Sequence, residues 1–438
     1  MMIASHSGSM TWLGKRTATL DQSQRSSIWT EVYAWLALLP TLFITVSGRI
    51  QTDAGPVAFR FTAMEEDSLA RRVTRLACSV LILFLMSMQA RGIRAACKQA
   101  KLLLLLPALA FASTLWSQNP SHTLVDAANL TLTILFALYL YLRYPGERLI
   151  SFLTFAAAIS LLLSIFVVIV FPSIGIDGFQ QDSWRGIFGQ RNNCAAVCTL
   201  FLVLGLHYRA RVFTEHLTRG IVLFLSALFI LMSGSRTGWI LAALALLLTF
   251  GLRFTVRLRS LDRVAFLMAI TIPTILLVSL VASNFTQILA LMDKDPTLTQ
   301  RTIIWAEVLP SIAKHPFLGY GYSSFWTGLN GESMQAVLTT GWMEGQAQDG
   351  YLDVLLQLGV VGLVPLIWIF LRAFRQVVSR IEGRVADASV RFAIVLLPLM
   401  LVENIGESSF LLPLGIPWFY TLIALMTLNF SPSHLEAA

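Results

Sequence analysis

The sequence predicts an all-α polytopic membrane protein with about twelve transmembrane helices and one large loop on the outer side of the membrane. Of its 438 residues, 56% are hydrophobic and only 13% are charged, whereas soluble domains carry about 25% charged residues. Apolar runs recur along most of the chain, and a helical span needs about 20 mostly apolar residues. The longest polar interval, residues 283–350, separates two groups of these runs. An ordinary soluble protein is therefore excluded.

The apolar runs divide the chain into five parts. These are an N-terminal arm at 1–32, nine spans over 33–282, the polar loop at 283–350, three spans over 351–429, and a tail at 430–438. Several runs are short, which leaves the count open by one or two. The runs lie at 33–48, 76–90, 102–116, 127–142, 149–171, 194–208, 220–233, 237–251, 264–282, 351–371, 392–403 and 410–429.

The basic residues predict the orientation of the spans. If the N-terminal arm is cytoplasmic, the loops on that side are all basic, as the positive-inside rule requires. We therefore interpret the net charge of +8 as membrane orientation and expect no nucleic-acid partner. Only the first outer loop, which contains five arginines, breaks the pattern. The basic loops lie at 91–101, 143–148, 209–219, 252–263 and 372–391.

Beyond that first loop, the outer side has few arginines, and they lie in short signatures. They are Arg185 and Arg191 in WRGIFGQRNN, Arg236 in SGSRTGW, and Arg301 in LTQRTIIW. Positive charge placed against the orientation rule indicates an anion site on that face. A guanidinium binds phosphate oxygens bidentately and keeps its charge, and the small SGSR turn could offer backbone N–H groups to the same anion. The alternative for Arg236 is a side chain that reaches the lipid headgroups.

The polar loop itself contains further candidate features. Residues Thr297 to Lys314 predict a helix at the membrane interface that ends before Pro316, with Trp305 one turn after Arg301. FLGYGYSSFW follows, with Tyr320 and Tyr322 between glycines and other aromatic residues. Either this turn packs at the membrane interface, where aromatic residues are common, or its rings form a platform for sugars.

Acids and amides close the loop immediately before the next span, and a carboxylate there could serve as a general base. The alternative for any one of them is a solvated loop side chain. We find no nucleotide-binding glycine loop, zinc spacing or Ser-His-Asp order, and we expect no metal and no soluble cofactor. The residues concerned are Glu344, Gln346, Gln348, Asp349 and Asp353.

Four stretches resemble, in this order, the O-antigen ligase and Wzy-type polymerase family of bacterial envelope enzymes, and within it the ExoQ-type exopolysaccharide polymerases. The resemblance covers about residues 180–370. The stretches are WRGIFGQRNN, SGSRTGW, LTQRTIIWAEVLPSIAKHPFLGYGYSSFW and DGYLDVLLQLGVVGL.

The resemblance implies a GT-C-like glycosyltransferase in the bacterial inner membrane, with its site on the periplasmic face. Such enzymes transfer glycan from an undecaprenyl-diphosphate carrier to an acceptor hydroxyl without metal. By motif, Arg236 and Arg301 are the residues expected to hold the diphosphate. The expected partners are the lipid-linked oligosaccharide, membrane lipids and a chain-length regulator.

The sequence departs from the family pattern where the base is expected. The family usually has a His-Asn pair ahead of the Tyr-Leu that begins the following span, and this chain has Gln348 and Asp349 at the matching positions. In the family, GIFG is often followed by His-Lys-Asn, whereas this chain has Gln190, Arg191 and Asn192. Glutamine cannot accept a proton. Either Asp349 replaces the base, or diphosphate departure needs little base assistance, or activity has been lost. We favour the first.

Three functions remain open at this stage. The leading one is a polymerase of lipid-linked repeat units in exopolysaccharide biosynthesis, and a close alternative is a ligase that transfers finished glycan to a lipid A core or a protein. A polysaccharide transporter or flippase is the third. It is disfavoured because no ionisable residues lie in the middle of the spans, where proton coupling would require them.

Overall fold

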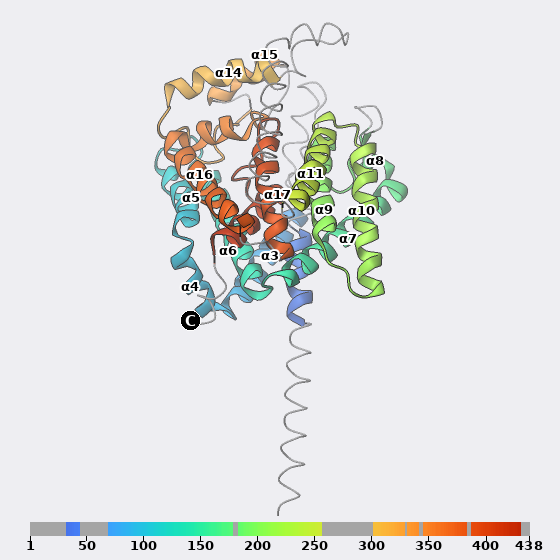
Figure 1. Cartoon of the computed structure of the whole chain (residues 1–438). Helices are drawn as coiled ribbons and strands as arrows, with labels where there is room; N and C mark the ends of the chain where they lie inside the picture. The colour runs from blue at the N-terminus through green and yellow to red at the C-terminus, as the bar shows by residue number, and fades with distance from the viewer. Residues whose placement is uncertain are drawn as a thin grey trace, which may run out of the picture.

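The computed structural model describes residues 32–43, 69–177, 183–255, 301–328, 331–340, 345–382 and 387–430. These residues form a helical bundle with one two-stranded antiparallel pair (Figure 1). The elements are a helix at Val32–Phe43, α3 (Leu69–Ser87), α4 (Ala90–Gln99), α5 (Lys101–Ala112), η1 (Ser113–Leu115), α6 (Pro120–Arg143), α7 (Glu147–Val170), α8 (Pro172–Gly175), β1 (Ile176–Asp177), β2 (Ser183–Trp184), α9 (Arg191–His207), α10 (Phe213–Met232), α11 (Arg236–Thr255), α14 (Arg301–Lys314), η3 (Gly331–Ser333), α15 (Met334–Thr340), α16 (Gly350–Glu382), α17 (Ala388–Glu403) and α18 (Ile416–Asn429).

The core of the bundle is formed by α9, α17 and α18, which are buried along nearly their whole length. A helix that is apolar on every side is stable only when other helices surround it. Tyr420 on α18 joins the three, because its ring contacts Phe201 on α9 at 6.0 Å and Phe392 on α17 at 6.5 Å between centroids. These three helices therefore form the packed centre against which the other described helices lie.

Among the described helices, five are long and apolar enough to cross a membrane. They are Pro120–Arg143, Glu147–Val170, Phe213–Met232, Arg236–Phe254 and Gly350–Val377. A sixth is obtained if α3 and α4, bent by 92° at their junction, count as one broken span. The prediction of a helical, multi-pass membrane protein is confirmed, but the count of about twelve is not. Each apolar run overlaps a described helix except 264–282, which lies outside the described residues, as do residues 44–48 of the first run.

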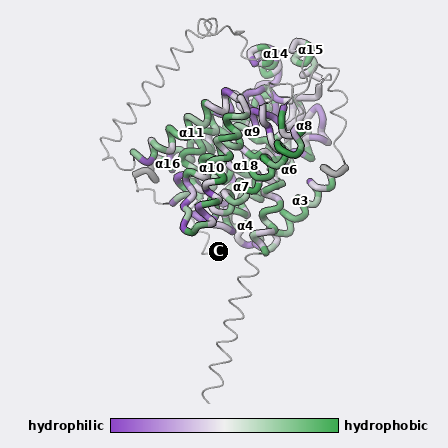
Figure 2. The backbone as a smooth tube through the Cα atoms, turned by 90° about the vertical axis from the view of Figure 1, so that its right-hand side faces the viewer, coloured by the Kyte–Doolittle hydropathy of each residue, from purple (hydrophilic) through white to green (hydrophobic). Residues whose placement is uncertain are grey.

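The helices α14 and α15 lie across one end of the bundle, which we call the α14 end (Figure 1). Contacts here join segments that lie between the predicted spans: Gln118 N–H donates to the Tyr320 carbonyl at 3.3 Å, and Ser235 Oγ donates to Asn192 Oδ1 at 2.9 Å. At the opposite end, Arg209 and Glu147 join two predicted inner loops at 2.9 Å. Figure 2 shows hydrophobic residues through the body of the bundle and hydrophilic ones toward its ends. Loops predicted to lie on the outer side thus meet at the α14 end, and loops predicted to lie on the inner side meet at the opposite end.

The helix α16 is broken near Gly359, which has φ 61° and ψ −160°. The turn 316–321 enters the break and restores the hydrogen bonds: Val360 N–H donates to the Pro316 carbonyl at 2.9 Å, and Tyr320 N–H donates to the Leu356 carbonyl at 2.8 Å. A Cβ on Gly359 would lie 2.3 Å from the Phe317 carbonyl carbon, so only glycine fits. The polar loop is therefore anchored inside the last group of helices, which the sequence did not predict.

The predicted interfacial helix is present as α14, which begins at Arg301 and ends at Lys314, two residues before Pro316. Residues 297–300 lie outside the described part. Ile304 and Val308 are buried and form a second apolar cluster with Tyr320, Phe325 and Leu356. The helix is therefore held on the bundle through the 316–326 turn.

Candidate functional site

The centre of the candidate site is Arg301, the first residue of α14. Its Nη2 donates to Glu407 Oε1 at 3.0 Å, and the side chains are only 17% and 10% exposed. A buried pair of this kind is held in a defined geometry, because loss of either partner would leave an uncompensated charge. Glu407 lies in the turn between α17 and α18, which the sequence analysis treated only as a short loop.

The Arg236 turn reaches the same place from α11. Ser235 begins the helix as its N-cap, accepting a hydrogen bond from Gly238 N–H at 3.2 Å. A Cβ placed on Gly406 would lie 2.8 Å from Arg301 Nη1 and 3.6 Å from the Thr237 methyl group. Thr237 and Arg301 therefore border the same residue of the α17–α18 turn. Arg236 itself is exposed, and its guanidinium has no hydrogen bond or ion pair with the described residues.

Asp349 lies directly before α16 and caps it. Its Oδ1 accepts from the N–H groups of Tyr351 and Leu352, both at 2.9 Å, and its own N–H donates to Ser408 Oγ at 3.0 Å. Within the described part of the chain Oδ2 has no hydrogen-bond partner. Burial raises the pKa of Asp349, although the two N–H groups and nearby Arg301 act in the opposite direction. One oxygen thus holds the helix end, and the other has no partner among the described residues.

Gln348, the other residue at the expected His-Asn position, has a positive φ of 55°. This conformation is uncommon for a residue with a side chain and directs the chain into α16. Gly350 N–H then donates to the Asn404 carbonyl at 2.8 Å. The 348–350 segment and the α17–α18 turn are therefore built against each other.

The α17–α18 turn contains a closed polar network. The carboxylate of Glu403, 1% exposed, accepts from Asn404 Nδ2 at 2.8 Å and from Ser409 Oγ at 2.6 Å. Asn404 Oδ1 accepts in turn from the N–H groups of Ser409 and Phe410. Satisfied networks of this kind rigidify a segment, and this one fixes the turn that presents Glu407 to Arg301.

Trp305 and Asp353 hold the segment around Ala347 in place through hydrogen bonds. Trp305 Nε1 donates to the Ala347 carbonyl at 3.0 Å. Asp353 is 3% exposed, and its two oxygens accept from Trp326 Nε1 at 2.8 Å and Ala347 N–H at 2.9 Å. Of the two acids at the start of α16, Asp353 therefore has both carboxylate oxygens hydrogen-bonded, whereas Asp349 has one oxygen without a partner among the described residues.

The two earlier arginines behave differently from each other. Arg185 donates to three backbone carbonyls, those of Ile174 at 2.9 Å, Ser173 at 3.3 Å and Gly189 at 3.4 Å. It therefore closes the loop before α9. Arg191, in the first turn of α9, has a buried Nε with no hydrogen-bond partner among the described residues. Of this pair, only Arg191 has a buried nitrogen without a hydrogen-bond partner among the described residues, and the sequence alone did not distinguish them.

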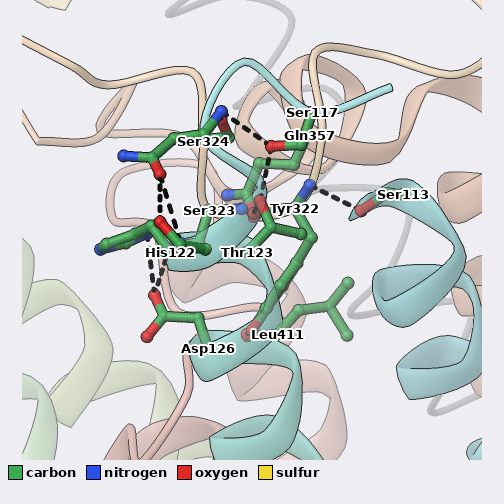
Figure 3. Close-up of polar contacts among 12 residues, drawn as sticks. Ser113, Ser117, His122, Thr123, Asp126, Tyr322, Ser323, Ser324, Gln357 and Leu411 are labelled. Atoms are coloured by element: carbon green, nitrogen blue, oxygen red, sulfur yellow. Dashed lines mark hydrogen bonds and ion pairs between the residues drawn. The ribbon is translucent and has the colours of Figure 1, made fainter. Parts of the chain in front are cut away.

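Tyr320 and Tyr322 are buried, at 4% and 0% exposure. Their hydroxyls donate to the carbonyls of Ser311 and Leu411. Figure 3 shows Tyr322 below the turn, with the Tyr322 N–H bonded to Ser113 and Thr123 beside it. Both tyrosines thus contribute to packing in this conformation, and a contact with sugar stays a prediction.

The same turn is tied to the start of α6. Asn119 N–H donates to Ser324 Oγ at 2.8 Å, and Ser323 Oγ is bonded to Asp126, which also lies 3.8 Å from His122 Nδ1 (Figure 3). The sequence analysis singled out none of the α6 residues. A signal existed, since an acid and a histidine one helical turn apart precede an apolar run.

Of the other predicted site residues, Glu344 lies outside the described residues. Arg301, Asp349 and the start of α11 are brought together around residues 403–409. The sequence analysis missed Glu403 and Glu407. The stretch ENIGE between two apolar runs was their signal, because carboxylates at the end of a membrane helix are costly unless paired.

Comparison with known proteins defines the class of the chain. Residues 221–367 match the family model described as O-antigen ligase. This interval runs from α10 through α14 into α16 and includes Arg236, Arg301 and Asp349. The resemblance to the O-antigen ligase family is therefore confirmed for this part of the chain.

A particular relative is consistent with this class. The chain is 27% identical over 177 residues to the exopolysaccharide production protein ExoQ of Rhizobium meliloti (strain 1021). The aligned region covers 39% of this chain and 41% of that protein, so the match spans less than half of the relative. The chain is thus a multi-pass membrane protein that is similar over part of its length to the O-antigen ligase family and to ExoQ.

Proposed function

We propose that the chain is a membrane glycosyltransferase that joins lipid-linked oligosaccharide repeat units into exopolysaccharide. The donor would be an undecaprenyl-diphosphate-linked glycan and the acceptor a sugar hydroxyl, at the periplasmic face of the bacterial inner membrane. The observation that supports the proposal is the meeting of Arg301, the start of α11 and Asp349 around the α17–α18 turn.

In the proposed reaction the acceptor hydroxyl attacks the anomeric carbon of the donor sugar. A new C–O bond forms as the bond from that carbon to the diphosphate oxygen breaks, and undecaprenyl diphosphate leaves with the bonding electrons. The hydroxyl proton passes to a base. Charge accumulates on the diphosphate, so cations placed beside it stabilise the transition state more than the ground state.

Arg301 and Arg236 are the proposed diphosphate ligands. Arg301 is held by Glu407 at 3.0 Å through one nitrogen, Nη2, which fixes the plane of the guanidinium and leaves Nη1 at the Gly406 side of the turn. Arg236 is exposed at the start of α11, where the N–H groups of the first helical turn also favour an anion. One arginine is thus pre-oriented, and the other can move onto the ligand.

Asp349 is the proposed base, because its Oδ2 is available while Oδ1 is held by two N–H groups. Burial raises its pKa, which makes it a stronger proton acceptor than an ordinary aspartate, and a catalytic pKa closer to the working pH is more effective. Gln348 beside it can orient a hydroxyl but cannot deprotonate it. Asp349 would thus do what a histidine does at the matching family position.

A ligase is the second candidate function, because the matched family model is described as O-antigen ligase. Ligase and polymerase would use the same donor and the same diphosphate ligands. They differ in the acceptor, which is either the growing lipid-linked chain or a lipid A core or protein. A chain-length regulator would be a partner only of the polymerase.

The test uses the purified full-length protein in lipid nanodiscs with an undecaprenyl-diphosphate oligosaccharide as the only substrate. A polymerase gives a ladder of longer lipid-linked chains and releases one undecaprenyl diphosphate per bond formed. No product from the donor alone, together with transfer when a lipid A core is added, would establish the ligase. No release of undecaprenyl diphosphate with either acceptor would reject both functions.

A further inference from the structure

A cavity of about 680 Å³ opens at the end of the bundle opposite α14. It lies where the C-terminal ends of α9 and α11 meet the N-terminal parts of α10 and α17 (Figure 1). Half of its lining residues are arginines, and no acidic residue of the described chain lines it. The lining consists of Leu206, His207, Tyr208, Arg209, Ala210, Arg211, Arg219, Leu252, Arg253 and Arg391.

Contacts within the protein account for only part of this charge. Arg209 and Arg211 pair with the one carboxylate of Glu147, at 2.9 and 2.8 Å. Arg219 and Arg253 donate to the carbonyls of Gly205 and Leu206, each at 3.0 Å. Carbonyls at a helix C-terminus orient a guanidinium, but they carry only partial charge. Two further acids lie close to these arginines: Glu215 Oε2 accepts from the Arg211 N–H at 2.6 Å, and Asp387 acts on Arg391. Among the described residues, the five lining arginines still outnumber Glu147, Glu215 and Asp387, so the cavity keeps an excess of positive charge.

The crowding of these arginines is costly. Burial and nearby Arg209 lower the pKa of Arg391, although Asp387 acts in the opposite direction. The positive-inside rule explains why inner loops are basic. It does not require arginines from three helices and one loop to surround one hollow. A bound anion would relieve the repulsion.

The surroundings of the cavity indicate what kind of anion fits. Arginine binds phosphate oxygens through paired N–H groups. Exposed apolar rings lie beside the lining residues: Phe213 is 80% exposed at the start of α10, and Phe254 is 50% exposed next to Arg253. Phe250, 55% exposed, lies under Arg253 at 5.7 Å. A charged hollow with an apolar border matches a molecule with a phosphate head and acyl chains.

We propose that this arginine cavity is a binding site for the phosphate headgroup of an anionic phospholipid. The site is separate from the α14 end and does not depend on the glycosyltransferase proposal. Basic pockets between membrane helices on the cytoplasmic side commonly hold such headgroups. The bound lipid would join α9, α10, α11 and α17 and stabilise the folded protein in proportion to its occupancy.

The test measures lipid binding to the purified full-length protein by native mass spectrometry and by thermal unfolding in detergent. The probes are phosphatidylglycerol, phosphatidylcholine, and inorganic phosphate with pyrophosphate. The double variant combines Arg253→Gln with Arg391→Gln. The single variant Arg253→Lys keeps the positive charge but loses the paired N–H donors. The control is Arg372→Gln, which removes an exposed arginine in the C-terminal half of α16 that does not line the cavity.

We expect phosphatidylglycerol to remain bound and to raise the unfolding temperature, whereas phosphatidylcholine does neither. The double variant should bind at least tenfold more weakly, Arg253→Lys should fall between, and the control should match the wild type. If the double variant does not fold, loss of wild-type lipid binding with rising salt decides the question. Equal binding of both lipids, or equal protection by inorganic phosphate, would overturn the proposal.

Discussion

At the α14 end, the central arginine of the candidate site is paired with an acid, whereas at the opposite end the described arginines outnumber the acids around one cavity. Arg301 is paired with Glu407, and the acids Glu403 and Asp353 are closed into hydrogen-bond networks. Around the cavity, the carboxylate of Glu147 serves two arginines, and the other described acids close by are Glu215 and Asp387. A matched network holds a few side chains in fixed positions, which suits chemistry. An unmatched cluster creates a general attraction for anions, which suits binding to a membrane surface.

The comparison predicts that single changes have large functional effects at the α14 end. The largest is expected for Asp349→Asn, which keeps a cap for α16 but removes the proposed proton acceptor. Loss of a general base typically slows a reaction by about 10² to 10⁴. The measurement is the rate of undecaprenyl diphosphate release from a lipid-linked oligosaccharide in nanodiscs.

The control for Asp349 is Gln348→Ala, which removes a side chain at the adjacent position without removing a base. It should reduce the rate much less than Asp349→Asn. A normal rate and chain length with Asp349→Asn would show that this carboxylate is not the base, while the diphosphate site could still stand.

Arg301→Ala is expected to lower the same rate by about 10² to 10³, the usual cost of removing one donor to a developing charge. It also leaves Glu407 buried without its cation, a loss of about 3–5 kcal/mol in comparable buried pairs. The double variant Arg301→Ala with Glu407→Gln separates these effects. It should regain thermal stability but not activity, and recovery of activity would assign Arg301 a purely structural part.

The reaction rate at the α14 end and lipid binding at the opposite end should depend differently on pH. Asp349 must be ionised to accept a proton, and burial raises its pKa. The rate is therefore expected to fall tenfold per pH unit on the acid side, beginning above the pH at which an ordinary aspartate becomes protonated. Phosphatidylglycerol binding at the opposite end depends on arginines, which stay charged, and should not change over that range. A rate that is flat through the acid limb would exclude Asp349 as the base.

Much of the α14 end could be predicted from the sequence because its signals are local. The C-terminal end of α14 followed from Pro316, and the outer arginines stood out against the orientation rule. The break in α16 could not be predicted, because GVVGL reads as an uninterrupted apolar run. It depends on the 316–321 turn, which supplies hydrogen bonds from about 40 residues away.

Other features depend on pairings that no local pattern contains. Arg185 was expected to bind substrate on the same grounds as Arg191, yet its guanidinium is occupied by backbone carbonyls. Glu407 was missed because short turns were judged by their arginines alone. The arginine cavity was hidden for the reverse reason, since each inner loop was already explained by orientation and their convergence appears only in the fold.

The smallest expected effects test how tightly each end is built. A Cβ on Gly350 would lie 2.0 Å from Asn404 Oδ1, an atom that already accepts two N–H bonds and cannot move away. Gly350→Ala should therefore destabilise the protein by about 1–3 kcal/mol, the usual cost of overpacking. Gly220, in the part of α10 near the arginine cavity, has no atom of the described residues within 4 Å of its Cβ position. Gly220→Ala should instead stabilise by up to about 1 kcal/mol, because alanine favours the helix. The two changes should thus shift the thermal unfolding temperature in opposite directions. Shifts of the same sign would mean that the α14 end is no more rigid than the opposite end, and the distinction between a matched site and an open cluster would then fail.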